Sequence, residues 1–330
     1  MAAAVAKPVH VRGAQRRAPL PITAVKDPFR ALTPSAGANW ASRDHHCFDD
    51  RSRKSKVLIC FMAGYKPELW QYAMPRFSAA ATQGDICLVT PGLRSDDLRK
   101  HCRTEGWSYL GTAVPDVSLA QNLCYQLHPY ASMFVKVDED MFLLPDTITK
   151  LLSQYHAIKA DGVVDLGFIA PMMPLNGICY RPLLEMLGLL GDFEHRFGKA
   201  RSAHAGLPIQ DDPKTARWIW EKTAPLSATA EKLGRKPPVH LPCSIRLNIG
   251  MIAFERKFWR DVGYLPVNRR RLGAGLTTQG ADEEHICGKA VTLSRPGVVT
   301  TAALAGHFAF NAQYESMLKL LKRRPKLFSV

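Results

Sequence analysis

Between residues 55 and 137, short apolar runs alternate with helical segments, and this alternation constrains the fold more than any other feature. The runs at 55–65, 84–92, 107–113 and 133–137 are rich in strand-forming residues. Strands that alternate with helices form a parallel sheet covered by helices on both faces. Such sheets bind ligands beyond the carboxyl ends of their strands. The sequence therefore predicts an α/β fold, with a ligand site at that edge.

Three consecutive acids follow the fourth of these runs. In "FVKVDEDMFLLPD" (134–146) they are Asp138, Glu139 and Asp140. Side chains alternate along an extended strand end, so Asp138 and Asp140 share one side and Glu139 points to the other. Two carboxylates on one side repel each other unless a cation lies between them, and Mg²⁺ or Mn²⁺ suits such oxygen ligands. The alternative interpretation is a solvated acidic turn.

The remainder of the chain carries further strand and helix signals. A helix is expected after Pro145, a buried strand at 165–174, and a strand followed by a short helix within 248–265. A late strand is expected in "VVTTAALAGHFAF". Residues 190–242 combine turn-forming sequences with scattered aromatic residues, and we interpret them as an irregular segment on the acceptor side.

The charge balance is strongly basic. Lysine and arginine number 44 against 29 acids, which gives a formal net charge of +15. Residues 1–52 predict a basic, flexible arm, and residues 313–330 predict a basic helix or tail. A field of this sign attracts polyanions such as nucleic acid, although it also serves solubility.

Cysteine spacing and hydropathy limit the classes of protein to which this chain can belong. The eight cysteines are scattered without any CxxC pair, which predicts reduced thiols rather than a zinc cluster or a disulfide framework. Apolar runs stay well short of the roughly 20 residues that a transmembrane helix needs. We therefore expect a cytoplasmic protein, or one inside the host cell if the source is a virus.

Five motifs, taken in order, resemble one enzyme family. "FVKVDEDMFLLPDTI" resembles the D-x-D signature of GT-A-fold nucleotide-sugar glycosyltransferases. "LAQNL" (119–123) and "NIGMIAFERKFWRDVGYL" (248–265) are similar to segments near the donor in that family. "GADEEHI" (280–286) resembles its acidic catalytic motif, and "GHF" (306–308) resembles its late metal-binding histidine. The resemblance spans residues 55–310 and implies a GT-A-like, mostly parallel sheet.

The resemblance also implies site residues. Asp138 and Asp140 would hold the metal, with Asp140 the direct ligand, and His307 would complete the coordination with a nitrogen that suits Mn²⁺ better than Mg²⁺. A histidine of the core or of a loop is the alternative for His307. Residues expected to contact the nucleotide sugar, which the family pattern suggests is a UDP-sugar, are Asn122, Lys136, Asp138, Gly250 and Arg256.

The acidic motif "GADEEH" offers the catalytic base. Its candidates are Asp282, Glu283 and Glu284, and the resemblance favours Asp282. A carboxylate within reach of the acceptor hydroxyl would take its proton, and the reaction would then invert the anomeric centre. Acids are also common at helix N-termini without any chemistry, because the helix dipole favours them there, so Asp282 as a simple N-cap is the alternative.

The resemblance gives a domain layout and leaves the acceptor open. Residues 53–312 would form one catalytic domain, with a nucleotide-sugar half at 53–150 and an acceptor half at 151–312. One branch of similar enzymes glycosylates hydroxymethylated pyrimidines in DNA, and the basic charge favours such a DNA acceptor. The alternatives are a polysaccharide, lipid or protein acceptor, and a basic nucleic-acid-binding module without catalysis.

Overall fold

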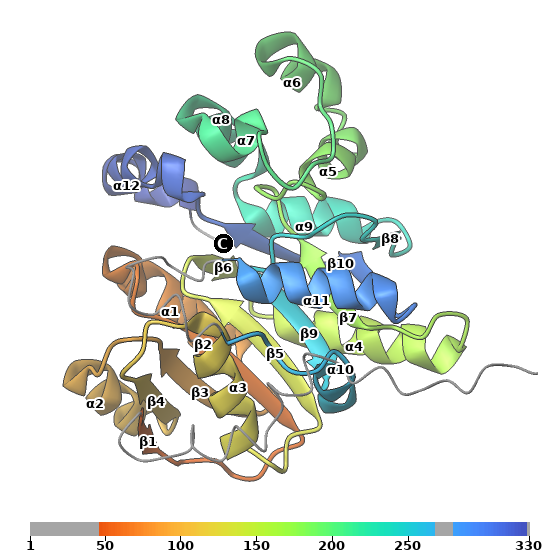
Figure 1. The fold of residues 1–330 in the computed structure, drawn as a ribbon. Coiled ribbons are helices and arrows are strands. Elements are labelled where there is room, and N and C mark those ends of the chain that lie inside the picture. The colour runs from red at the N-terminus through yellow and green to blue at the C-terminus, as the bar shows by residue number, and fades with distance from the viewer. Residues whose placement is uncertain (1–45, 268–279, 329–330) are drawn as a thin grey trace, which may run out of the picture.

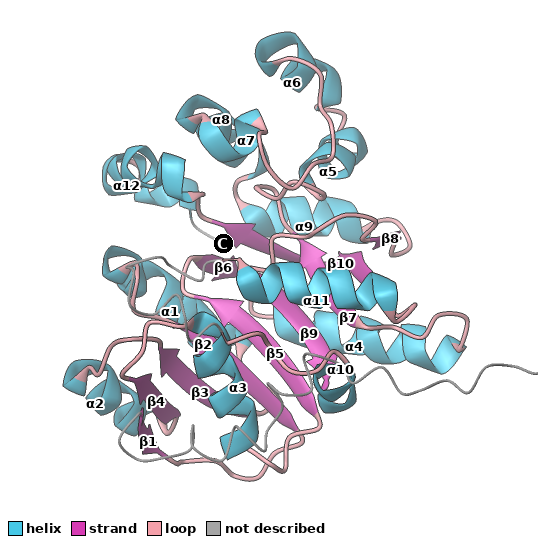
Figure 2. Cartoon of the chain, in the orientation of Figure 1, coloured by secondary structure: helices cyan, strands magenta, loops and turns pink. Residues whose placement is uncertain are grey.

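The computed structural model describes residues 46–267 and 280–328 of the 330-residue chain. Within these ranges one ten-stranded sheet forms the centre of the molecule, with helices on both sides (Figure 1, Figure 2). The strand order is β1-β4-β3-β2-β5-β9-β7-β10-β6, with β8 paired to β10. The strands are β1 (His46–Asp49), β2 (Val57–Met62), β3 (Asp85–Thr90), β4 (Ser108–Thr112), β5 (Met133–Asp138), β6 (Met141–Leu143), β7 (Phe168–Met172), β8 (His240–Pro242), β9 (Met251–Glu255) and β10 (Gly297–His307).

The first half of the sheet is parallel, as the alternating sequence predicts. Strand β2 pairs in parallel with both β3 and β5, and β3 pairs in parallel with β4. Helix α1 (Trp70–Ala80) covers one face, where Phe77 stacks on Phe61 with ring centroids 4.1 Å apart. Helix α3 (Val117–Leu127) covers the other face, where Tyr125 stacks on Phe134 at 4.2 Å. The α/β fold with a mostly parallel sheet is confirmed.

The second half of the sheet is mixed. Strand β9 lies between β5 and β7 and runs antiparallel to both. Strand β10 is parallel to β7 and therefore runs in the same direction as β5. As a result, β5 and β10 end at the same edge of the sheet where β9 begins. The amide of Asp138, the last residue of β5, donates to the carbonyl of Gly250 just before β9 at 2.9 Å.

Short helices join and flank the strands. In the first half they are η3 (Pro67–Leu69) and α2 (Asp96–Glu105), besides α1 and α3, while α4 (Thr147–Asp161) packs on β7 and β10. In the second half they are α5 (Tyr180–Leu187), α6 (Leu190–Phe197), α7 (Pro208–Asp211), α8 (Pro213–Thr223), α9 (Leu226–Gly234), α10 (Arg256–Asp261), α11 (Ala281–Thr292), η5 (Asn311–Gln313), α12 (Tyr314–Arg323) and η6 (Pro325–Phe328). Helices α5 to α8 and α12 gather beyond one end of the sheet (Figure 1).

The prediction that residues 190–242 are irregular is wrong. Four helices, α6 to α9, occupy most of this segment. Each of them is short, and prolines at 208, 213 and 225 stand at or next to three of their starts, so they resemble turns in the sequence. Helix α8 is held by packing, because its Trp218, Ile219 and Trp220 are buried. Tertiary contacts of this kind are not visible in a local pattern.

The ends of the chain differ from the expected layout in one respect. Strand β1 pairs antiparallel with β4, so part of the span 1–52 belongs to the sheet. Residues 1–45 of that basic span, and the basic "NRRR" run at 268–271, lie outside the described residues. All eight cysteines are free thiols. Among the helices that the structure describes, none has the length and apolar character needed to cross a membrane.

Candidate active site

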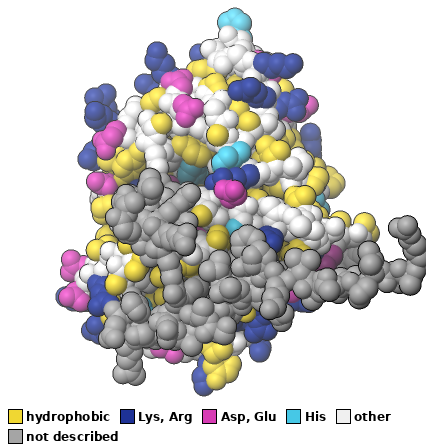
Figure 3. Space-filling model, in the orientation of Figure 1, with side chains coloured by type: hydrophobic (Ala, Val, Ile, Leu, Met, Phe, Trp, Pro, Cys, Tyr) yellow, Lys and Arg dark blue, Asp and Glu magenta, His cyan; other side chains and the backbone are white. Residues whose placement is uncertain are grey.

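A cavity of about 470 Å³ opens at the edge where β2, β5 and β10 end and β9 begins. Side chains from both halves of the sheet and from the start of α11 line it. Basic, acidic and histidine side chains meet around a hollow on the face shown in Figure 3. Seven residues predicted from the sequence line the cavity: Lys136, Asp138, Asp140, Gly250, Asp282, Glu283 and His307.

Asp138 is the last residue of strand β5, and Lys136 on the same strand binds its carboxylate. The buried Lys136 ammonium donates to Asp138 Oδ2 at 2.6 Å and to the carbonyl of Ile249 at 2.7 Å. Lys136 thus joins the end of β5 to the segment before β9. Because the Lys136 ammonium already forms an ion pair with Asp138, its main role is to position that carboxylate.

Asp140 faces the cavity between two nitrogen groups. Lys66, in the loop after β2, forms an ion pair with Asp140 Oδ2. His307 Nε2 lies 3.4 Å from the same oxygen. His307 Nδ1 lies 3.0 Å from the carbonyl of Leu175. A carbonyl can only accept, so Nδ1 carries a proton, and Nε2 is the ring nitrogen that faces Asp140.

Glu139 and Asp140 lie in a turn after β5 rather than in the extended backbone expected from the sequence, and Glu139 has different partners from its two neighbours. Its carboxylate accepts from three successive backbone amides, those of Gly64 at 2.9 Å, Tyr65 at 2.7 Å and Lys66 at 2.8 Å. The indole of Trp70 is a fourth donor. Glu139 therefore fixes the loop that carries Lys66 to the cavity.

The carboxylates of this cluster have perturbed pKa values for identifiable reasons. Burial raises the pKa of Asp138, and the neighbouring Asp140 charge adds to this against the opposing effect of Lys136. Burial alone would also raise the pKa of Asp140, but Lys66 and His307 outweigh it and hold that pKa well below its usual range. Burial would lower the pKa of Lys66, yet the Asp140 carboxylate raises it, so the ammonium stays charged.

The start of helix α11 supplies two further acids with different partners. Asp282 is 5% exposed and accepts from the amide of Gln121 on α3 at 2.8 Å. Glu283 Oε1 accepts from Arg246 Nε at 2.7 Å, and its Oε2 accepts from the amide of Ile249 at 3.2 Å. One acid thus has a neutral partner and the other is tied to a guanidinium.

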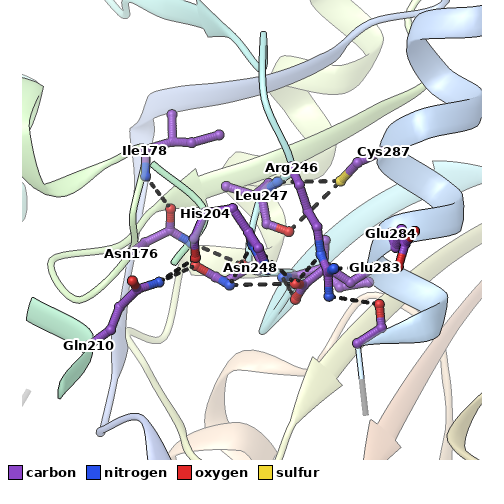
Figure 4. A network of polar contacts seen from close by, with 12 residues as sticks. Asn176, Ile178, His204, Gln210, Arg246, Leu247, Asn248, Glu283, Glu284 and Cys287 are labelled. Atoms are coloured by element: carbon purple, nitrogen blue, oxygen red, sulfur yellow. Dashed lines mark hydrogen bonds and ion pairs between the residues drawn. The ribbon is translucent and has the colours of Figure 1, made fainter. Parts of the chain in front are cut away.

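Glu283 also belongs to a network that forms the second wall of the cavity (Figure 4). Asn248 Nδ2 lies 3.5 Å from both Glu283 Oε1 and His204 Nδ1. Asn176 donates to the carbonyl of Asn248 at 2.9 Å. This wall consists mainly of neutral hydrogen-bonding groups, which suits hydroxyl groups of a bound molecule.

Gly250 packs closely against Met141. Its carbonyl accepts from the Asp138 amide, and a Cβ on Gly250 would come within 2.7 Å of Met141 Sδ. A side chain there would require the Met141 side chain to move. Gly250 lines the cavity through its backbone.

Two predicted donor contacts do not line the cavity. Asn122 is buried, where it donates to the carbonyl of Leu265 at 2.8 Å and accepts from Trp259 at 2.9 Å. Arg256 lies at the opposite end of β5 from Asp138, where its guanidinium donates to the carbonyls of Ala131, Tyr125 and His128. The reason is the direction of β9: its antiparallel course sends the helix that follows it away from the cavity.

Several polar residues that line the cavity were not predicted from the sequence. Among them are Lys66, Asn176, His204 and Asn248. Lys66 had a usable signal, because it follows the end of the first parallel strand, where a ligand is expected. His204 had none, since it comes from the loop before α7 and reaches the cavity only through the fold.

The donor set fits a divalent cation bound first by Asp140 and His307. Their facing atoms are 3.4 Å apart, and the combination of a carboxylate oxygen with an imidazole nitrogen suits Mn²⁺. Asp138 stands further off, paired with Lys136. In the part of the chain that the structure describes, a tighter group of potential ligands, with all three ligand atoms within 4.8 Å, is Cys87, Cys124 and His128. That group is buried in the core, where thiols act as small apolar side chains.

No protein family matches this sequence, and no curated protein matches it. Solved structures that share features of the fold include a mannosyltransferase from Pyrobaculum calidifontis in complex with GDP-Man and Mn²⁺, with a TM-score of 0.44 and 10% identity over 87% of this chain and 67% of that one. Another is glucosyl-3-phosphoglycerate synthase from Mycobacterium tuberculosis with Mn²⁺ and UDP, with a TM-score of 0.41 and 10% identity over 84% and 81%. At this distance a likeness identifies neither the activity nor the ligands of this chain, which its own residues must decide.

Proposed function

We propose that this chain is a metal-dependent glycosyltransferase that moves a sugar from a nucleotide-diphosphate sugar to a hydroxyl group. The observation that carries the proposal is the charge balance of the cavity. Its lining includes five acidic residues against two lysines, at the ligand-binding edge of a parallel sheet. A diphosphate anion could bind among these acids only together with a divalent cation.

Asp140 and His307 would hold that cation, with Asp138 beside them. Such an ion would act as a Lewis acid that neutralises charge on the leaving diphosphate. Lys136 keeps Asp138 in position, and Glu139 keeps the loop of Lys66 in position. We propose Mn²⁺ rather than Mg²⁺ because an imidazole nitrogen is part of the set.

Asp282 is the better candidate for the base. A general base needs an oxygen that can take a proton, and the partner of Asp282 is a neutral amide. Both oxygens of Glu283 are engaged, one of them by the Arg246 guanidinium and the other by the Ile249 amide. Asp282 as base implies an inverting reaction, and Glu283 serves to position the segment before β9.

The activity is tested by incubating the protein with UDP- and GDP-sugars and Mn²⁺, and by following release of the nucleotide. We expect release that depends on Mn²⁺, stops with EDTA and is lost in Asp140→Ala. Tight duplex DNA binding with no metal-dependent turnover of any donor would instead favour the basic binding module.

An anionic acceptor is supported by a basic groove beside the cavity. Phe310 and Asn311 line the cavity, and the chain continues from them into α12. Helices α8 and α12 enclose a second cavity of about 230 Å³, whose basic lining residues are Lys214, Arg217, Lys319 and Arg323. We propose that this basic groove binds the phosphates of the acceptor, and hydroxymethylated DNA is the first acceptor to test.

The acceptor test compares hydroxymethylated duplex DNA with a neutral oligosaccharide. Transfer to DNA, with a binding constant that falls steeply with salt, supports the proposal. In Lys319→Ser/Arg323→Ser we expect the logarithmic salt slope to fall by about 2, since each lost phosphate contact removes roughly one unit. Arg235→Ser, an exposed change on α9, is the control. Transfer to the oligosaccharide alone would move the proposal to a polysaccharide acceptor.

A further inference from the structure

Lys66 lies at the position that a metal held by Asp140 and His307 would need. Its ammonium pairs with Asp140 Oδ2, the same oxygen that faces His307 Nε2. The side chains of Lys66 and Asp140 are only 18% and 7% exposed, so solvent ions compete weakly for this carboxylate. A lysine and a divalent cation cannot both occupy this oxygen at close range, since two cations repel each other.

The backbone of Lys66 is fixed, whereas its side chain has room to move. Glu139 binds the amides of residues 64, 65 and 66, which anchors the loop. The ammonium also lies 5.5 Å from the ring centre of Tyr314, a cation–π contact at the start of α12. A lysine is a point charge on a flexible stem, so it can change partners without any change in the loop.

We propose that Lys66 is the counter-cation of Asp140 in the ligand-free protein and moves onto the donor diphosphate when a divalent metal binds. This inference rests on the proposed function. With no diphosphate present, a metal ion that binds Asp140 must displace the Lys66 ammonium, which then has no anion of comparable strength to pair with. With a diphosphate present, the displaced ammonium gains a new anion.

The consequence is a coupling between metal and nucleotide. Each ligand should bind more tightly when the other is present, and this part of the coupling should depend on Lys66. Coupling of this kind is reciprocal, so it can be measured from either ligand. Direct contact between metal and diphosphate adds a second contribution that does not involve Lys66. A variant of Lys66 separates the two.

The experiment measures free Mn²⁺ by electron paramagnetic resonance during titration, with and without UDP or GDP. Lys66→Met should bind Mn²⁺ alone about tenfold more tightly than the wild type, equal to roughly 1.4 kcal/mol, because no ammonium competes for Asp140. It should bind the nucleotide more weakly in the presence of Mn²⁺, so the coupling factor falls at least about tenfold. Lys66→Arg should keep part of the coupling, since it keeps the charge.

Lys150→Met is the matched control. Lys150 forms an exposed ion pair with Asp146 at the start of α4, at 2.7 Å, and does not line the cavity. Its removal should leave the Mn²⁺ titration unchanged. A purely structural role for Lys66 predicts a lower melting temperature with unchanged coupling, so thermal unfolding is measured on the same samples.

The outcomes separate this inference from the proposed function. If the wild type binds neither Mn²⁺ nor a nucleoside diphosphate, the proposed function fails and the inference fails with it. If the wild type binds both, but Lys66→Met binds Mn²⁺ alone no more tightly than the wild type, only the role of Lys66 is overturned. Tighter metal binding together with weaker coupling supports it.

Discussion

Two clusters of consecutive acids line one cavity. In each cluster, one acid holds a loop in place and a neighbouring acid faces the cavity. In the cluster at the end of β5, Glu139 accepts from four fixed donors while Asp138 and Asp140 face the cavity. In the cluster at the start of α11, Glu283 is bound by Arg246 and the Ile249 amide while Asp282 has the Gln121 amide. One acid of each cluster holds a loop, and its neighbour remains available to a ligand.

The hydrogen-bond and ion-pair partners of each carboxylate, rather than its position in the sequence, decide whether it holds a loop or reacts with a ligand. A carboxylate that accepts from several backbone amides or from a guanidinium is fixed in place. A carboxylate with a lysine that can move, or with a neutral amide, can still accept a metal or a proton. Substitutions should therefore separate activity from stability within each cluster.

The largest effect is expected for Asp140→Asn. It removes the charge that binds the metal, so metal-dependent donor turnover should fall about 1000-fold. The melting temperature should also fall, because the lowered pKa of Asp140 means that its charge stabilises the folded state, and the variant leaves the buried Lys66 ammonium without its partner. Donor turnover and differential scanning fluorimetry on one preparation test both. A large loss of stability without loss of turnover would make Asp140 the structural member of its cluster.

Asp282→Asn should lower turnover by about 100-fold, the usual range for a general base, and leave donor binding unchanged. Steady-state kinetics and nucleotide titration separate these effects. Gln121→Ala is the companion variant, since it removes only the partner that orients Asp282, and it should have a smaller effect on turnover. Gly280 is the N-cap of α11, so wild-type turnover in Asp282→Asn would leave Asp282 with a structural role through Gln121.

Glu139→Gln should act on stability before activity. It weakens the charge-assisted bonds to the loop of Lys66, and we expect the free energy of unfolding to fall by about 2–3 kcal/mol. Urea denaturation measures this value. Metal affinity should change less than in Asp140→Asn. If Glu139→Gln leaves stability intact but abolishes metal binding, Glu139 rather than Asp140 would be the metal-binding acid of the first cluster.

Glu283→Gln is expected to have the smallest effect. It weakens the pair with Arg246, which is partly exposed, so a loss of about 1 kcal/mol of stability is expected. Turnover should fall less than tenfold, mainly through a weaker hold on the segment before β9. A loss as large as that of Asp282→Asn would indicate that Glu283 is the base.

Local pattern was enough to predict most of the parallel half of the fold. The alternation of strands and helices from 55 to 137 reflects burial on both faces, and burial is encoded residue by residue. Pattern failed in residues 190–242, where short helices are held by tertiary packing of residues such as Trp220, which donates to the carbonyl of Phe308 at 3.0 Å. It also missed the edge strands β1, β6 and β8, each three or four residues long.

The sequence by itself determined that Asp138, Glu139 and Asp140 stand at the carboxyl end of a buried strand, because burial on both faces makes that strand a mainly apolar run. Only the tertiary structure decided what each acid meets. The direction of β9 takes Arg256 away from the cavity, and the loop after β2 brings Lys66 to Asp140. Strand direction and loop course depend on contacts between residues distant in the chain, which no local pattern records.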